Sequence, residues 1–138
     1  MVRKQEALRL IDANFNRAKE GLRVCEDLFR FVYENRKLTS AFKKLRHKCS
    51  KTLLAFPVPY CELVRFRDSQ DDLGKKSAIL EKKKISWNDL AVSNMKRSEE
   101  AFRVLEEASK IFAPKISRRF QSLRFKLYEL EKKVLKEL

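Results

Sequence analysis

The chain contains one fourteen-residue helical segment twice, and this repeat constrains the fold more than any other feature. The first copy, NFNRAKEGLRVCED, begins at Asn14, and the second, NMKRSEEAFRVLEE, begins at Asn94, an offset of 94 − 14 = 80. Six of the fourteen positions are identical, and five of those six are polar. A shorter repeat relates FKKLRHK, from Phe42, to FQSLRFK, from Phe120, with four identities at an offset of 78. The duplication therefore covers two helices and predicts a repeated helical hairpin.

The spacing of apolar residues predicts that these helices are amphipathic and pack on one another. From Ile11 to Val32 apolar side chains alternate four- and three-residue spacings, and the same pattern returns eighty residues later, from Ala91. A chain of 138 residues holds one domain, and its two Gly and three Pro offer few tight turns for a β-sheet. We therefore expect an all-α fold in which the duplicated helical hairpin forms a four-helix bundle with pseudo-twofold symmetry.

Helix start and stop signals set the expected boundaries within this single domain. Thr39 is a candidate N-cap for the second helix, and Ser86 opens the third with a capping-box layout. The third helix is expected to reach Phe112 and to end before Pro114, and the last helix to begin near Ser117. The resulting division is hairpin repeat 1 at about 5–55, an unduplicated loop insert at about 56–85 and hairpin repeat 2 at about 86–133.

The net charge of +14 predicts an affinity for polyanions, which include nucleic acid, acidic membranes and phosphorylated small molecules. Surface ion-pair networks of the kind found in heat-loving organisms are an equal alternative explanation of the basic composition. Three cysteines without CxxC spacing and a single histidine argue against a disulfide framework or a zinc site. The sequence has neither a signal-peptide pattern nor an apolar run of about 18 residues, so we expect a cytoplasmic protein without membrane contact.

The repeated polar residues predict a polar pocket between the first and third helices. Asn14 and Arg17 lie on a stripe beside the apolar seam, and Asn94 and Arg97 form the equivalent stripe. Gly21 and its twin are small, so a backbone or a ligand could approach there. We expect the two arginines to meet across a shared interior site. The alternative is a buried polar network that fixes helix register, and for Arg23 and Arg103 we favour salt bridges along their own helices.

Phosphate binding here would depend on side chains, because the sequence has neither GxxxxGK[ST] nor GxGxxG. Arginine forks and a Mg²⁺ ion would then neutralise the phosphates. The candidate arginines are Arg17, Arg46, Arg65, Arg67, Arg97 and Arg124. The candidate carboxylates for Mg²⁺ are Asp68, Asp72, Glu20 and Glu100.

Four motifs in order give the chain a family resemblance. The segments IDANFNRAKEGLRVCED, KLRHK, RDSQDDLG and NMKRSEEAFRVLEE resemble those of a small all-helical bacterial hydroxymethylpyrimidine phosphate kinase domain, found alone or fused to thiamine phosphate synthase. The resemblance implies ATP- and Mg²⁺-dependent phosphorylation of 4-amino-5-hydroxymethyl-2-methylpyrimidine phosphate to its diphosphate. The chain departs from the family pattern at Gln70 and Asp71, where members often have Glu-Gly, and at Cys25, where Leu is common.

The resemblance, combined with the residue chemistry, gives each candidate residue a role. Arg67 and Asp72 are expected to be catalytic, and Asp68 and Asp72 to hold the metal. Substrate and phosphate groups are expected to contact Asn14, Arg17, Glu20, Arg46, Asn94, Arg97 and Glu100.

Two identical half-sites cannot distinguish a phosphate donor from an acceptor, so the unduplicated insert must break the symmetry. We expect Arg67, Asp68, Asp72 and Gly74 to fold over one side of the shared pocket, with Gly74 allowing a sharp turn.

Two other classes of function stay open at this point. A non-catalytic interaction or regulatory domain, such as a dimerisation unit for thiamine phosphate synthase, would use the repeat for packing only, and a homodimer is compatible with either interpretation. A nucleic-acid-binding module is disfavoured, because the ten Phe fall mostly on core positions and the strongest repeat mixes Arg with Glu.

Overall fold

The computed structural model describes residues 4–74, 85–111 and 113–138, and the described chain is helical without a strand. The elements, in order, are α1 (Lys4–Asp27), a π-helical turn η1 (Leu28–Val32), α2 (Arg36–Leu54), α3 (Tyr60–Leu63), α4 (Trp87–Ser109) and α5 (Pro114–Glu137). The expected all-α class is confirmed. The turn α3 lies within the insert, where no helix was expected, and residues 75–84 of the insert lie outside the described residues.

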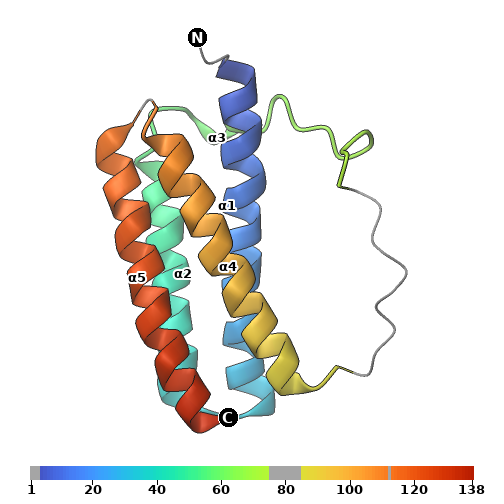
Figure 1. The fold of residues 1–138 in the computed structure, drawn as a ribbon, viewed down its shortest axis with the longest axis vertical. Helices are drawn as coiled ribbons and strands as arrows, with labels where there is room; N and C mark the ends of the chain where they lie inside the picture. Colours follow the sequence, from blue (N-terminus) through green and yellow to red (C-terminus); the bar gives the residue numbers. More distant parts are fainter. Residues whose placement is uncertain (1–3, 75–84, 112) are drawn as a thin grey trace.

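The four long helices form a bundle in which each packs against two neighbours. Helix α1 packs against α2 and α4, and α5 packs against the same two helices. The two helices of each hairpin run in opposite directions, whereas α2 and α4 run in the same direction, so α1 and α4 are antiparallel (Figure 1). The described part of the insert begins with α3, which packs against α1. This arrangement places the two copies of the repeated segment side by side.

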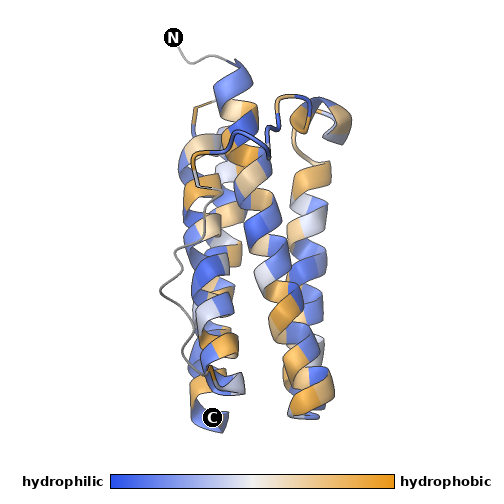
Figure 2. Ribbon diagram, turned by 90° about the vertical axis from the view of Figure 1, so that its right-hand side faces the viewer, coloured by the Kyte–Doolittle hydropathy of each residue, from blue (hydrophilic) through white to orange (hydrophobic). Residues whose placement is uncertain are grey.

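The core is built from the apolar seams that the sequence predicts. In α1, Ile11, Phe15 and Leu22 are at most 3% exposed, and in α4 Met95 and Phe102 are fully buried. Each long helix carries both hydrophobic and hydrophilic stretches (Figure 2). Burial of these seams is the main source of stability, at roughly 25 cal/mol for each Å² of apolar surface removed from water.

Helix ends agree with the sequence prediction at one position and differ at three. Ser86 caps α4 with the expected capping box, in which Ser86 and Asp89 each accept a hydrogen bond from the other's backbone N–H. The N-cap of α2 is Asn35 and not Thr39, whose hydroxyl instead donates to the carbonyl of Asn35. Helix α4 ends at Ser109, and Pro114 begins α5 at its first turn, three residues before the expected start.

Several contacts occur twice, at the offsets of the repeat. An ion pair joins the buried Glu26 of α1 to the half-buried Arg46 of α2 at 2.9 Å, and its counterpart joins the buried Glu106 of α4 to the buried Arg124 of α5 at 2.9 Å. The expected ladders of Arg23 and Arg103 with the acids three and four residues later are also present in both copies. The pseudo-twofold relation proposed from the sequence would produce this duplication.

Gly21 lets α1 and α4 approach closely at the centre of their contact. A Cβ atom placed there would lie 2.8 Å from the backbone carbonyl of Asn94 and 2.2 Å from Oγ of Ser98. The Ser98 hydroxyl donates a 2.9 Å hydrogen bond to the carbonyl of Ala18 within this buried contact. The close approach that the sequence predicted at Gly21 is therefore made by the backbone of α4.

Candidate functional site

A polar cleft of about 500 Å³ lies between the outer face of α1 and the start of the insert. It brings together five residues proposed from the sequence, namely Asn14 and Arg17 from the first repeat and Arg67, Asp68 and Asp72 from the insert. The other residues that line it are Glu6, Arg9, Leu10, Asp12, Ala13, Asn16 and Ser69. The cleft thus joins a repeated helix to the unduplicated insert, but no residue of the second repeat lines it, so it is not the shared pocket that the sequence predicted.

Asp12 and Arg67 hold the insert against α1. The Nε of Arg67 donates to Oδ2 of Asp12 at 2.7 Å, and its Nη2 donates to Oδ1, so the pair is bidentate. Asp12 is 3% exposed, whereas the Arg67 side chain keeps 41% of its surface exposed. Hydrogen bonding to Asp12, and then to Tyr60, raises the pKa of Arg67 above its already high ordinary value. Arg67 is therefore a fixed positive charge at the edge of the cleft.

The two aspartates of the insert are exposed and shape the loop through local hydrogen bonds. Oδ1 of Asp68 accepts from the backbone N–H of Asp71 at 3.0 Å, and Oδ1 of Asp72 accepts from that of Gly74 at 2.8 Å. Neither carboxylate has an ion pair with a described residue, so their remaining oxygen atoms can accept a ligand. Leu73 and Gly74 lie in a turn, but Gly74 does not have a positive φ, so this turn does not depend on the conformational freedom of glycine.

The interior position expected for Arg17 and Arg97 is wrong, since both side chains are exposed. Each arginine comes one residue before the contact of Ala18 with Ser98. Successive residues of a helix differ in direction by about 100°, so a residue next to a buried contact points away from that contact. Because α1 and α4 are antiparallel, both arginines then lie on the same exposed face of the helix pair. Arg17 lines the cleft and Arg97 does not.

The remaining candidates lie outside the cleft. Asn94 is half-buried and donates to the carbonyl of Leu90, as Asn14 does to that of Leu10. Glu20 and Glu100 are exposed. Arg46 is held by two hydrogen bonds to the buried Glu26 and borders a separate groove, so its geometry favours a role in joining α1 to α2. Their proposed contacts with substrate remain predictions.

Comparison with protein-family models matches residues 9–133, nearly the whole chain, to the model described as the ThiD2 family. The chain belongs to the ThiD2 family. No solved structure matches it.

Relatives of this ThiD2-family chain share about a third of its residues. A protein of Nostoc punctiforme named thiamine-phosphate synthase is 35% identical over 133 residues, which are 96% of this chain and 36% of that protein. A protein of the same name from Synechocystis is 37% identical over 128 residues, 92% of this chain and 36% of that protein. The chain thus spans about a third of the length of these relatives.

Asp12 is a residue of the cleft that the sequence predictions omitted. Its twin in the second repeat, at 12 + 80 = 92, is Val92, so an acid stands in one copy where the other has an apolar side chain. An unduplicated charge on a repeated helix needs an unduplicated partner, and Arg67 in the insert supplies it. The difference between the two copies was therefore an available signal.

The residues of the cleft fit a Mg²⁺ ion that arrives with a phosphorylated substrate. No group of three or more His, Cys, Asp or Glu in residues 4–74, 85–111 and 113–138 forms a cage for a metal ion. Mg²⁺ is usually bound by one or two carboxylates together with substrate phosphates and water, and Asp68 and Asp72 offer that donor set at the cleft.

Within the described helices, none is long and apolar enough to cross a membrane.

Apart from the cleft, two glutamates, Glu99 of α4 and Glu131 of α5, form an acidic cluster between these helices. Glu99 is 5% exposed, and its carboxylate receives an ion pair from Lys96 at 3.3 Å, while Lys96 also contacts Glu131 at 3.0 Å. Burial, followed by the neighbouring Glu131, raises the pKa of Glu99 to about 7. The twin of Glu131, at 131 − 78 = 53, is Leu53, so this cluster too is unduplicated.

Proposed function

We propose that the chain is a kinase that transfers the γ-phosphoryl group of ATP to 4-amino-5-hydroxymethyl-2-methylpyrimidine phosphate. Involvement in thiamine biosynthesis is supported by membership of the ThiD2 family and by the relatives named thiamine-phosphate synthase. The kinase activity itself is our proposal, and it rests on the resemblance of the four motifs and on the composition of the cleft.

The observation that carries this proposal is the meeting of Arg17 with the insert residues Arg67, Asp68 and Asp72 in one polar cleft. Phosphoryl transfer needs positioned positive charge and a metal site more than it needs a strong nucleophile. The cleft offers arginines for phosphate oxygens and exposed carboxylates for a metal. Its volume of about 500 Å³ lies within the usual range of small-molecule sites.

Each residue of the cleft would have a separate role in the phosphoryl transfer. A phosphate oxygen of the pyrimidine phosphate attacks the γ-phosphorus of ATP, the bond to the β-phosphate oxygen breaks, and ADP leaves. Arg17 and Arg67 hold phosphate oxygens and stabilise the charge that moves between them. Asp68 and Asp72 hold the Mg²⁺ ion, which when bound neutralises the nucleotide phosphates. Asp12 positions Arg67 and does not touch the substrates.

The direct test is a kinase assay with the pyrimidine monophosphate and ATP·Mg²⁺, with the diphosphate product identified by phosphorus NMR. Asp72→Asn should lower turnover by a hundredfold or more, on the scale of losing one electrostatic contact to the transition state. Asp71→Asn is the matched control, since its side chain lies in the same loop but does not line the cleft. Wild-type protein that forms no diphosphate, or equal turnover in the two variants, would refute the proposal.

Asp12→Val tests the positioning role, because it installs the residue of the other repeat. Arg67 would lose its bidentate partner but remain solvated. Turnover should fall, and added guanidinium should not restore it, since Arg67 is still present. Arg67→Ala should lose turnover in the same way and regain part of it with guanidinium. Equal rescue of both variants would contradict a positioning role for Asp12.

A second candidate is an interaction or regulatory unit for thiamine-phosphate synthase. It is favoured by one observation, that the chain covers only about a third of relatives that carry that name. In this case the melting temperature would not respond to ATP·Mg²⁺ or the pyrimidine phosphate, because only a ligand that binds the folded state raises it.

A further inference from the structure

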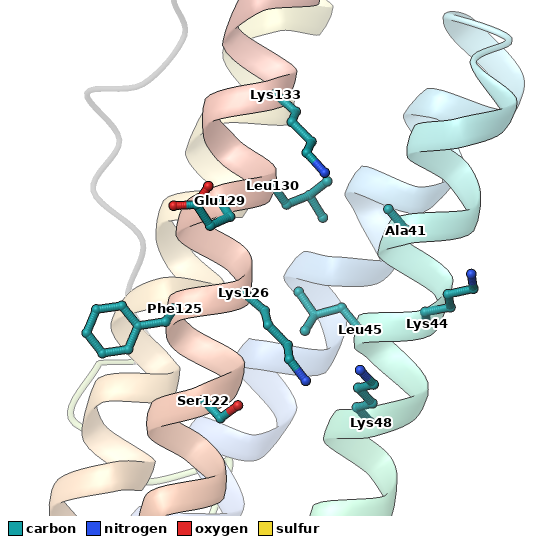
Figure 3. A pocket seen from close by; sticks show the side chains of 10 residues that line it. All are labelled: Ala41, Lys44, Leu45, Lys48, Ser122, Phe125, Lys126, Glu129, Leu130 and Lys133. Carbon is teal, nitrogen blue, oxygen red and sulfur yellow. The ribbon is translucent and has the colours of Figure 1, made fainter.

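A basic groove lies between α2 and α5 and has a volume of about 670 Å³. Four lysines surround it, and Ala41, Leu45 and Leu130 form its apolar part. We call it the lysine groove, after Lys44 and Lys48 of α2 and Lys126 and Lys133 of α5. Figure 3 shows Lys48 and Lys126 reaching towards each other between the two helices, whereas Glu129 and Phe125 point away.

The positive charge of the lysine groove is not neutralised by the protein. Lysine ion pairs among residues 4–74, 85–111 and 113–138 involve Lys96 and Lys110, and none of the four groove lysines has a carboxylate partner there. The proximity of the Lys48 ammonium, together with burial, lowers the pKa of Lys126. The two ammonium groups therefore repel each other in the free protein, at a cost that an anion would remove.

Lys48 and Lys126 occupy equivalent positions of the repeat, since 48 + 78 = 126. Both side chains line the lysine groove and also a neighbouring hollow, so the basic surface continues past this pair. This smaller hollow, of about 220 Å³, adds Lys51 and Arg119. Across both hollows, six cations face one carboxylate, that of Glu129, which points away from the centre.

We propose that the lysine groove binds the di- or triphosphate group of a small molecule, at a site separate from the cleft beside α1. Lysine is a compact charge that binds phosphate oxygens from several directions, and six cations are enough to neutralise a triphosphate. The volume of about 670 Å³ suits a small ligand, and the apolar residues can contact a ring attached to the phosphates. Inorganic tripolyphosphate and a nucleoside triphosphate share this chemistry.

Isothermal titration of the full chain with tripolyphosphate tests the proposal. The double variant Lys48→Gln/Lys126→Gln should bind about tenfold or more weakly, because two charged contacts are lost. Lys132→Gln is the matched control, since Lys132 is an exposed lysine of α5 that lines neither hollow. The double variant should melt at the same or a higher temperature than the wild type, because the repulsion is removed. Equal affinity in the double variant and the control would overturn the proposal.

Further experiments distinguish binding at this site from binding at the proposed kinase site, and they distinguish small phosphates from other anions. In a chain that also carries Asp72→Asn, the double variant should still bind tripolyphosphate more weakly than the protein with both lysines, whether or not the chain is a kinase. Lys48→Arg/Lys126→Arg keeps both charges and should bind like the wild type, which excludes a folding defect as the cause. ATP that binds more tightly than tripolyphosphate would identify a nucleoside as the ring. Binding of long single-stranded nucleic acid without binding of tripolyphosphate would refute a small-molecule site.

Discussion

Gly21→Ala should destabilise the protein, although alanine normally favours a helix. The substitution gains about 1 kcal/mol in helix propensity. The new Cβ would lie 2.2 Å from Oγ of Ser98 and 2.8 Å from the carbonyl oxygen of Asn94. Ser98 can rotate away, but it then gives up its buried hydrogen bond to Ala18, worth about 1 kcal/mol. The carbonyl cannot rotate away, so α4 must shift, at about 1–3 kcal/mol. The net loss is about 1–3 kcal/mol.

Thermal unfolding followed by far-UV circular dichroism measures this effect. For a chain of this size the melting temperature should fall by about 3–10 °C. Gly74→Ala is the control with the same chemical change, because among the described residues a Cβ there meets only Oδ1 of Asp72 at 3.4 Å. Gly74→Ala should therefore leave the melting temperature nearly unchanged or raise it slightly. A Gly21→Ala protein as stable as the wild type would show that the close contact of α1 with α4 is not required.

Three further predictions concern groups away from the cleft. Because burial raises the pKa of Glu99 from 4.5 to about 7, the folded state holds a proton that the unfolded chain releases. Stability should therefore fall as the pH rises from about 4.5 to 7, and a melting series should show less of this decline in Glu99→Gln. Glu106→Gln leaves the buried Arg124 without its charge partner and should cost about 3 kcal/mol in urea unfolding. A thiol reagent should modify Cys61 alone in the native protein, since burial raises the pKa of the other two thiols to about 12.

The bundle could be predicted because the apolar spacing within each helix is a local sequence feature and because it occurs in both copies of the repeat. An apolar seam with heptad spacing specifies which face of a helix is buried, and the repeat states that the two hairpins use equivalent faces. Helix ends were harder, because Asn35 and Thr39 are both good N-cap residues four positions apart. The sequence predicts that a helix ends before Pro114, but proline also suits the first turn of a helix, and Pro114 begins α5.

The cleft could be predicted only in part. The insert was expected to complete the site because it alone breaks the symmetry, and Arg67, Asp68 and Asp72 do lie beside Arg17. The prediction that Arg17 faces the interior between α1 and α4 was wrong. Whether Arg17 faces the core or the solvent depends on its angular position on α1. A stripe at the border of an apolar seam can face either way, and only the packing of α1 on α4 determines which.

The two copies of the repeat share a framework but differ where chemistry is proposed. The ion pairs between helices recur in both halves, which suits groups that hold the bundle together. On the outer face of the first helix, however, Arg9 and Asp12 line the cleft, whereas their twins are Asp89, committed to the capping box, and Val92. The second half therefore retains the counterpart of Arg17 without the residue that anchors a loop beside it. The proposed kinase site must distinguish a phosphate donor from an acceptor and therefore requires this inequality, which the ion pair of Asp12 with Arg67 would provide.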